Sequence, residues 1–363
     1  MKKTTFITSL AVTTMIIISF VCFANKKINN TMIDRTDIYK IIHYASLAGS
    51  SHNTQPWRVE VFPNDSITIF VDTSRLLKVV DPRGIELFIS VGAFIENLSI
   101  AANTLGYITE ITINETNINS NSPVSIIKLS KISSVQNLEV LKELELRTTL
   151  RIPFETVAIK TVDLEKIVSI APDNISFIPS SSPNGAFIAK KELEAYTIQA
   201  YNKDAQDELA AWMRFSNKDI NSKRDGLTPA GMGIKGIAGF FVRNFMKPDD
   251  SKKESFVKKG VEKTQKQVEN CAGWIIISTE EDNTKNLINI GRIYERINIE
   301  CRSLNIGFHP MNQIIEEYPV YKEVKDKLKL GKEIRFIARI GYVDKYPAPV
   351  SKRRSVESFT VFK

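Results

Sequence analysis

The chain has 363 residues, 43% of them hydrophobic and 25% charged, which is typical of a globular protein with one large or two ordinary domains and argues against wholesale disorder. The net charge of +8 would suit an anionic cofactor, an anionic membrane or a nucleic acid, but no zinc finger, RNP-type strand or basic zipper supports nucleic acid. Three cysteines and three histidines without metal-ligand spacing predict neither a disulfide framework nor a metal site.

The N-terminus has the pattern of a targeting segment. Lys2 and Lys3 precede an uncharged stretch from Thr4 to Ala24, and further lysines follow it. The stretch fits a signal peptide cleaved after Ala24, and it is also long enough for an uncleaved membrane anchor. Both alternatives predict an exported protein, periplasmic or membrane-anchored, with residues 1–30 as targeting segment and linker.

The rest of the chain alternates helical and strand patterns. Helical spacing is expected over 37–48, and alternating apolar residues predict a strand hairpin over 58–62 and 66–71. A long helix should follow Asp81-Pro-Arg-Gly and end near Leu105, before strands at 108–113 and 123–130. Further helices are expected at 138–146, 188–216, 254–270 and 286–304, and further strands at 274–278 and 334–340. Between two of these helices, the Gly-rich run 225–236 predicts a mobile loop or lid, and its Lys lacks the following Ser/Thr of a phosphate-binding P-loop.

One unit occurs twice in weak form. The segment beginning at Gly92 aligns with the segment beginning at Gly291, with Gly, Glu, Ile and Leu at the same offsets and similar elements around them. The boundary falls near residue 135. We therefore expect repeats over 31–135 and 136–363 within one intertwined domain, with a lid insertion at about 217–253.

Two short segments carry most of the functional information. The first, Ser50 to Trp57, holds hydroxyl, imidazole and amide groups that can read the edge of a flat heteroaromatic ring. The second, Arg147-Thr-Thr-Leu-Arg151, holds two cations and two hydroxyls that can clamp a phosphate. Together they fit flavin mononucleotide (FMN). The simpler alternatives are a capped turn for the first segment and a solvated helix end for the second.

The sequence resembles the nitroreductase family of FMN proteins, and most closely its Acg-type branch, in which two nitroreductase-like repeats are fused. Three signatures carry this resemblance: Ser51-His-Asn-Thr-Gln-Pro-Trp-Arg, Asp81-Pro-Arg-Gly-Ile-Glu-Leu, and Arg147-Thr-Thr-Leu-Arg-Ile-Pro-Phe. It implies an α+β fold with a central, mostly antiparallel sheet flanked by helices. Each repeat retains a different half of the family's FMN site, so the resemblance implies one complete site per chain, a second inactive one, and a monomer that acts as a fused dimer.

The resemblance also implies roles for individual residues. The loop residues should contact the ribityl chain and pyrimidine, the Arg147 segment and the basic tail should hold the phosphate, and the segment after Gly307 should pass over the flavin N5 edge. The candidate cofactor-binding residues are Ser51, His52, Asn53, Gln55, Arg147, Thr148, Thr149, Arg151, Pro310, Met311, Asn312, Arg353 and Arg354. No catalytic residue is assigned. Leu146 stands where the family usually has a second Arg, and Asn312 where it often has an acid.

The expected function is that of an FMN-dependent oxidoreductase that passes electrons to a nitroaromatic, quinone or related acceptor. NAD(P)H or a membrane electron donor would reduce it. The main alternative is a protein that sequesters or stores FMN under a lid with little turnover. A third class is a cofactor-free structural protein of the envelope.

Overall fold

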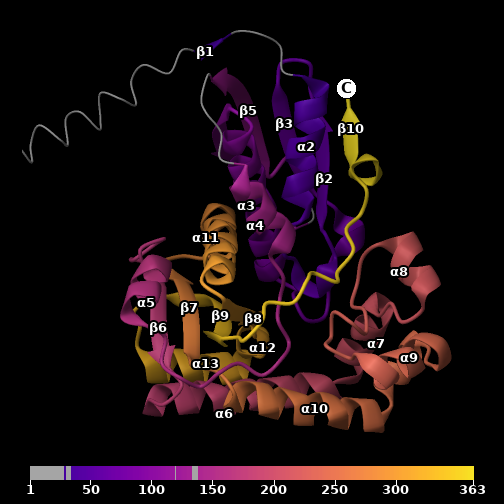
Figure 1. Cartoon of the computed structure of the whole chain (residues 1–363), viewed down its shortest axis with the longest axis vertical. Helices are drawn as coiled ribbons and strands as arrows, with labels where there is room; N and C mark the ends of the chain where they lie inside the picture. Colours follow the sequence, from indigo (N-terminus) through magenta and orange to yellow (C-terminus); the bar gives the residue numbers. More distant parts are fainter. Residues whose placement is uncertain (1–27, 30–33, 119, 133–137) are drawn as a thin grey trace, which may run out of the picture.

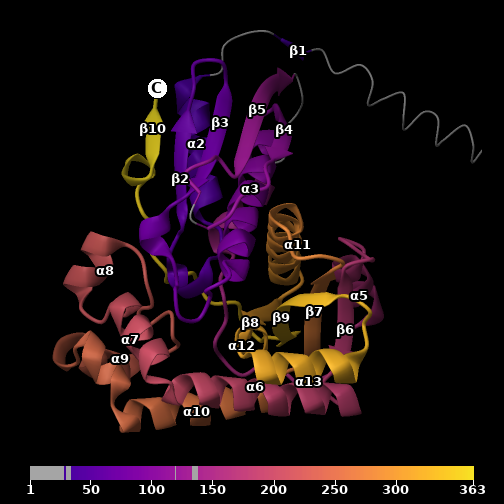
Figure 2. The ribbon, with the colours of Figure 1, turned by 180° about the vertical axis from the view of Figure 1, so that it is seen from behind.

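The molecule is an α+β protein with two mostly antiparallel sheets, which Figures 1 and 2 show from opposite sides. This computed structural model describes residues 28–29, 34–118, 120–132 and 138–363, so the predicted targeting stretch lies outside the described residues. The first sheet has the order β1 (Ile28–Asn29), β5 (Ser125–Ile132), β3 (Ser66–Val71), β2 (Trp57–Val61) and β10 (Thr360–Phe362), with β4 (Tyr107–Ile113) also paired to β5. The second has the order β6 (Ile175–Pro179), β7 (Gly273–Thr279), β9 (Glu333–Tyr342) and β8 (Ile306–Pro310). The predicted α+β class is confirmed, and the expected central sheet is divided into two.

The strands follow from their hydrophobic patterns. In β2, buried and half-buried residues alternate, as expected for a strand with one face on the core. β7 is buried along its whole length because β6 and β9 flank it and helices cover the sheet, which explains its continuous apolar run. The hairpin of β2 and β3 is confirmed, with Trp57 paired to Val71.

Two long helices lie between the sheets and pack against each other: α3 (Ile85–Thr104) and α11 (Thr284–Ser303). A Cβ atom on Gly92 would lie 2.1 Å from the Ile288 carbonyl oxygen, and one on Gly291 would lie 2.0 Å from the Ile89 carbonyl oxygen. Each glycine therefore faces the backbone three residues before the other glycine. This reciprocal contact agrees with the alignment of Gly92 on Gly291, although the two-repeat organisation itself stays a prediction.

The remaining α-helices surround the sheets and form a lateral group. Near the first sheet and the helix pair are α2 (Arg35–Ser46) and α4 (Glu139–Leu146), whereas α5 (Thr161–Val168) packs against α11 and β6 beside the second sheet. The second sheet is accompanied by α6 (Pro183–Tyr201), α10 (Glu254–Glu269), α12 (Gln313–Glu316) and α13 (Tyr318–Leu328). The lateral group consists of α7 (Lys203–Trp212), α8 (Asn217–Lys223) and α9 (Gly236–Phe245). Of the described helices, only α3 is long and apolar enough to cross a bilayer, and 94% of that stretch is buried inside the protein, as in a core helix.

Three features of the structure differ from what the sequence pattern alone would suggest. The helix expected over 188–216 divides at Asn202, whose side-chain oxygen accepts hydrogen bonds from Asp204 and Ala205 and so begins α7. The segment from Gly307 to Pro310 belongs to strand β8 rather than to a loop. The C-terminal strand β10, assigned to the second repeat, lies parallel to β2 in the first sheet.

Candidate functional site

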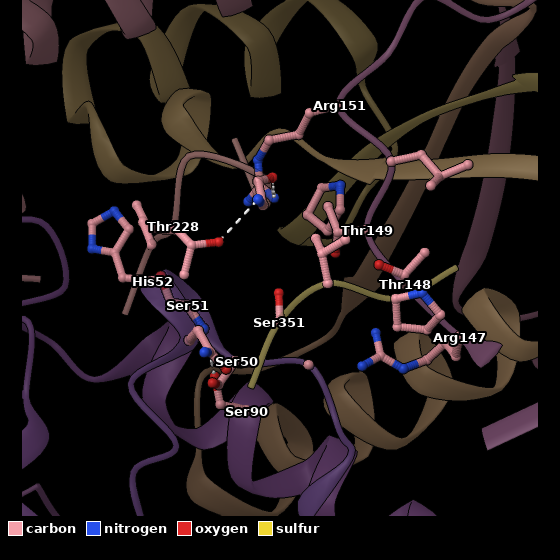
Figure 3. A pocket seen from close by; sticks show the side chains of 18 of the residues that line it. Ser50, Ser51, His52, Ser90, Arg147, Thr148, Thr149, Arg151, Thr228 and Ser351 are labelled. Carbon is pink, nitrogen blue, oxygen red and sulfur yellow. Dashed lines mark hydrogen bonds between the residues drawn. The ribbon is translucent and has the colours of Figure 1, made fainter. Parts of the chain in front are cut away.

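A cavity of about 220 Å³ lies where both predicted repeats meet. Figure 3 shows Ser50, Ser51, His52 and Ser90 on one side of it, and Arg147, Thr148, Thr149 and Arg151 on the other. Ser351, from the C-terminal tail, lies between these two groups. The two segments singled out in the sequence, almost one hundred residues apart, therefore face the same space.

The loop before β2 owes its shape to residues with left-handed backbone conformations. His52, Asn53 and Gln55 have φ angles of 47°, 53° and 53°. The Asn53 side chain donates hydrogen bonds of 3.2 Å to the carbonyl oxygens of Gly226 and Lys352. The loop is thus tied both to the Gly-rich segment and to the C-terminal tail, and these contacts stabilise a strained backbone.

Gln55 is fully buried and lies outside the cavity lining. Its amide donates to the Arg224 carbonyl oxygen at 2.9 Å, and its side-chain oxygen accepts from the Arg354 backbone N–H at 2.8 Å. The Arg354 guanidinium in turn donates to the carbonyl oxygens of Gln55 and Trp57, so it also lies away from the cavity. The structure therefore does not support direct cofactor contacts for Gln55 and Arg354. Both residues connect the loop to the tail.

His52 presents an unsatisfied polar atom beside the cavity. Its Nδ1 is buried and has no hydrogen-bond partner among the described residues. Burial, together with the nearby Arg151 charge, lowers the pKa of His52 to about 4. The imidazole is therefore neutral near pH 7 and retains hydrogen-bonding capacity that a bound group could use.

Arg147 lines the cavity but already has a partner. Its Nε lies 2.9 Å from Oε1 of Glu295, and both side chains are almost fully buried. Its Nη2 donates to the Leu47 carbonyl oxygen at 2.6 Å. Arg353 donates to the same oxygen at 3.1 Å, and burial and the Arg147 charge lower the pKa of Arg353 to about 10. One carboxylate, Glu295, thus lies beside two converging guanidinium groups.

A second group of cations has no carboxylate partner. In the part of the chain that the structure describes, no ion pair joins a carboxylate to Arg151, Lys263 or Arg339. Arg151 donates to the Gly231 carbonyl oxygen at 3.0 Å, and Arg339 donates to Nδ1 of His309 at 3.0 Å. Burial and neighbouring arginines lower the pKa of Lys263 to about 8 and that of Arg339 to about 9. Unbalanced positive charge therefore lies in and just behind the cavity wall, where it would attract an anion.

The opposite part of the lining is acidic. Glu86 accepts a 2.7 Å hydrogen bond from the Asn312 side chain, whose oxygen accepts from the Ile337 backbone N–H at 2.8 Å. Burial, the neighbouring Glu86 carboxylate and further contacts raise the pKa of Glu316 well above its usual range. Both Glu86 and Glu316 line the cavity and also a second, neighbouring one. The site therefore has a basic end and an acidic end, where the pKa of Glu316 is raised.

The structure brings ten of the thirteen candidate residues to the cavity: Ser51, His52, Asn53, Arg147, Thr148, Thr149, Arg151, Pro310, Asn312 and Arg353. Met311, like Gln55 and Arg354, is not among the lining residues. Met311 belongs to the buried apolar cluster that includes residues of the second sheet, whereas Pro310 and Asn312 line the cavity. The roles of all thirteen candidate residues as FMN contacts stay predictions. Among the described residues, no cluster of His, Cys, Asp or Glu has the geometry of a metal site.

Sequence reasoning missed several functional groups. Glu295 and Tyr294 lie within the repeated helix motif and could have been found from the shared Glu at its fifth position. Arg339 and Lys263 lie in a strand and a helix whose patterns give no sign that their charges meet behind Arg151. Ser90, Thr228 and Ser351 are single hydroxyls without a motif, and only the fold brings them together.

Comparison with known proteins gives a partial match. No protein-family model matches the sequence. Two curated proteins named as NAD(P)H nitroreductases, from Mycobacterium tuberculosis strains CDC 1551 and H37Rv, are each 34% identical over 79 residues, which is 22% of this chain and 23% of theirs. The chain thus matches under a quarter of the length of these relatives.

The solved structures found are more distant. A nitroreductase-like family protein from Bacillus cereus has 11% identity and a TM-score of 0.34, covering 63% of this chain and 98% of its own. A nitroreductase with bound FMN from Desulfitobacterium hafniense has 12% identity and a TM-score of 0.37, covering 60% and 94%. The FMN-dependent nitroreductase NfnB from Mycobacterium smegmatis, in complex with NADPH, has 11% identity and a TM-score of 0.36, covering 58% and 95%.

The curated sequence match, over the segment that it covers, relates this chain to the nitroreductase family.

Proposed function

We propose that the chain binds FMN in the cavity between its repeats and acts as an oxidoreductase of the nitroreductase type, in the Acg-type branch. The observation that carries this proposal is the uncompensated positive charge of Arg151, Arg339 and Lys263 at one end of the cavity. Buried cations without carboxylate partners are costly unless an anion neutralises them. A phosphate group is such an anion.

The residues present fit FMN at both ends. Arg151, Thr148 and Thr149, with Arg353 from the tail, would hold the phosphate, since guanidinium and hydroxyl groups donate to its oxygens. The Arg353 Nε is buried and has no hydrogen-bond partner among the described residues, as is also true of His52 Nδ1. These two donors or acceptors are therefore free for a ligand. Arg147 stays paired with Glu295, so it is left out of this phosphate-binding set.

Bound FMN would supply the capacity to accept and pass on electrons. The chain's own residues would orient it and limit access to it. Asn53 and Ser51 lie on a loop that is tied to three other segments, and so they offer a rigid edge to a flat ring. The Glu316 carboxyl group, whose raised pKa favours its protonated form, would be the proton donor at this end of the cavity.

Flavin titration tests the proposal. We expect the purified protein to bind FMN with a yellow absorbance spectrum and quenched flavin fluorescence. Riboflavin, which lacks the phosphate, should bind at least about tenfold more weakly, because each charge-assisted hydrogen bond contributes about 1.5–3 kcal/mol. Equal affinities for the two flavins, or no binding of either, would contradict the proposal.

A second candidate, an FMN-sequestering protein, is favoured by the segment that crosses the cavity. Gly226, Thr228, Gly231 and Gly233 line it, and Arg151 donates a hydrogen bond to this segment. A nicotinamide must approach the flavin to about 3–3.5 Å before hydride can move, so this segment would obstruct the donor. Stopped-flow reduction of the FMN-loaded protein by NAD(P)H and by a reduced quinone separates the candidates: fast reduction by either donor supports the reductase, and reduction by neither supports sequestration.

The proposal extends to the location and partners of the protein. The uncharged stretch from Thr4 to Ala24 supports export, and the globular part would then function outside the cytoplasm, where a membrane electron donor replaces NAD(P)H. Fractionation of cells that produce the full chain tests this, and recovery in the cytoplasm would contradict it.

A further inference from the structure

Helix α9 exposes an apolar face that nothing in the described structure covers. Ile237, Phe240, Phe241 and Phe245 are 85%, 53%, 59% and 67% exposed. They share the helical spacing that places them along one side, and the rings of Phe241 and Phe245 lie 5.0 Å apart. We refer to these four residues as the α9 face.

The helix is attached to the protein by its other side. Its buried residues are Gly239 and Val242, and Val242 packs with Met213 and Phe215. Small and medium apolar residues therefore make the inward contact of α9, whereas its three phenylalanines are exposed. This distribution is the reverse of that on a surface helix of a soluble domain, where the large apolar residues face the core.

The charged residues within α9 and directly beside it in the sequence are all positive. Lys235, Arg243 and Lys247 flank or interrupt it, and no Asp or Glu occurs from residue 226 to residue 248. The next acids along the chain, Asp249 and Asp250, are paired with Lys252 at 2.6 Å and Lys253 at 2.7 Å. An apolar face rich in Phe and flanked by Lys and Arg is typical of a helix that lies in the interface of an anionic bilayer.

We propose that the α9 face is a docking site for an anionic phospholipid membrane. The four side chains expose on the order of 400–500 Å² together, whereas a stable protein interface needs about 800 Å² from each partner. The face is therefore small for a dimer contact. Three phenylalanines and an isoleucine are nevertheless enough to enter the headgroup region, with cations placed to meet lipid phosphates.

The docking position does not depend on the N-terminal stretch. Residue 28, where the described part of the chain begins, lies at the opposite end of the molecule from α9 (Figures 1 and 2). The α9 face instead adjoins the cavity through the chain itself, because Gly233 and Lys235 line the cavity and α9 begins at the next residue. A docked protein would hold this side of the cavity at the lipid surface. If the proposed function is correct, this position favours lipid-soluble quinones as electron acceptors. The docking itself does not rest on the proposed function.

The experiment places an environment-sensitive fluorophore on α9. In a Cys22→Ser background of the full chain, Ile237→Cys is labelled with NBD, since Cys271 and Cys301 are buried. We expect a blue shift with vesicles of phosphatidylcholine and phosphatidylglycerol, quenching by brominated lipid tails, and neither effect with phosphatidylcholine alone. Val162→Cys on α5, a site that is 55% exposed, is the matched control and should not respond. Because the probe reports on α9 itself, insertion of the N-terminal stretch does not mimic the result.

A charge variant tests the electrostatic part. Arg243→Glu with Lys247→Glu, in the labelled background, should weaken partitioning into the anionic vesicles more than tenfold, because two attractive charges become repulsive. Circular dichroism should show unchanged folding, since Lys247 is exposed and Arg243 is only partly buried and has no ion pair among the described residues. The proposal is overturned if the probe does not respond to anionic vesicles. It is also overturned if the probe spectrum is already blue-shifted in buffer without vesicles. A shift that depends on protein concentration would show that a second copy of the chain covers the α9 face. A shift that does not depend on it would show that the chain's own residues cover the face.

Discussion

Arg147 and Arg151 stand four positions apart and have different electrostatic surroundings. Arg147 pairs with Glu295, so its charge is neutralised within the protein. Arg151 has Arg339 and Lys263 for neighbours, and each of these cations lowers the pKa of the other groups around it, including His309. The two residues look alike in the sequence, but only Arg151 has a charge that remains available to a bound anion.

This difference leads to a prediction about the two arginines. Arg151→Ala should weaken FMN binding about tenfold or more and leave riboflavin binding nearly unchanged, because it removes a charge-assisted contact to phosphate. The thermal stability of this variant should change little, because the substitution also removes the repulsion between Arg151 and the neighbouring cations Arg339 and Lys263. Arg147→Ala should instead destabilise the protein by about 3–5 kcal/mol, because Glu295 is left buried and unpaired. Flavin titration and urea denaturation measure the two effects.

The control is the double variant Arg147→Met/Glu295→Gln. It removes both charges and should recover much of the stability lost in Arg147→Ala. If Arg147→Ala weakens FMN binding without loss of stability, Arg147 is a direct phosphate ligand and the distinction drawn from the structure is wrong.

A buried carboxyl group should make stability depend on pH. Burial, with the nearby Glu86 charge, raises the pKa of Glu192 to about 8. Since the folded-state pKa lies above the ordinary value of 4.5, the group's stabilising contribution is fully present below about pH 4.5 and is lost as the pH rises through about 8. Glu192→Gln should therefore lose less stability than the parent between about pH 6 and pH 9, by about 2–3 kcal/mol.

Urea denaturation at both pH values checks this effect. Glu194→Gln, on the same helix but about half exposed and paired with Lys191, is the control and should follow the parent. Asp81 and Glu316 also have raised pKa values and remain in every variant, so only the difference between variants reports on Glu192. Parallel pH profiles for the parent and Glu192→Gln would show that Glu192 does not titrate in this range.

At the scale of single residues, the sequence predicts those groups that sit in a local motif. Ser51, His52 and Asn53 were identified because a short polar run before an apolar strand is unusual, and Arg151 because two cations enclose two hydroxyls. Gln55 belongs to the same run, yet its side chain donates a hydrogen bond to the Arg224 carbonyl oxygen and lies outside the cavity lining. Arg339 could not be predicted, since a strand pattern does not show which charge lies across from it.

At the scale of elements, the contact of α3 with α11 depends on glycine. The helices approach so closely that a methyl group at either Gly92 or Gly291 would meet main-chain atoms of the other helix. Main-chain atoms cannot rotate away as a side chain can. The same contact positions Glu295 for Arg147 and Tyr294 for the cavity, so the glycines act on the site through the helix packing.

We therefore predict that Gly92→Ala and Gly291→Ala each destabilise the protein by about 1–3 kcal/mol, as overpacked core positions do. Both should also weaken FMN binding, because α11 must shift. Gly260→Ala in α10 is the matched control: its new methyl group would meet only the hydroxyl end of the Tyr196 side chain, which can move. The control should be neutral or slightly stabilising, since Ala favours a helix over Gly by about 1 kcal/mol. Thermal melts of the three variants decide between these outcomes.

The positions of helices and strands along the chain can be predicted from hydrophobic periodicity. Which of these elements pack or pair with one another cannot. The sequence predicts α3, α11, β2, β3, β7 and β9 within a few residues because each has a clear period or apolar run. Strand β10 was missed because three residues are too few for a pattern. Its pairing with β2, three hundred positions earlier in the chain, is a tertiary fact that no local signal carries.

On the scale of the whole molecule, the C-terminal tail connects the two halves. After β9 the chain leaves the second sheet, brings Ser351 and Arg353 to the cavity, and ends as β10 beside β2 in the first sheet, as Figure 1 shows. The cavity consequently contains residues from the first repeat, the second repeat and the tail. Neither half could form it alone, which agrees with the prediction of one intertwined domain.

This arrangement predicts one FMN per chain in a monomer. The cations Arg147, Arg151 and Arg353 and the loop Ser50 to Asn53 meet at a single cavity. The pseudosymmetric position lacks half of this set, because the turn after α5 reads Ser-Ile-Ala-Pro-Asp-Asn where the first repeat has its Gln-Pro-Trp loop.

Flavin absorbance against protein concentration should therefore saturate at one equivalent, and sedimentation in detergent-free buffer at low protein concentration should give the mass of one chain. As a control, Arg151→Ala should lower the affinity without changing the saturating ratio. Two equivalents per chain would mean that the second position also binds flavin. One equivalent per two chains would mean that the site is completed by a partner, and either result would contradict a fused dimer with a single complete site.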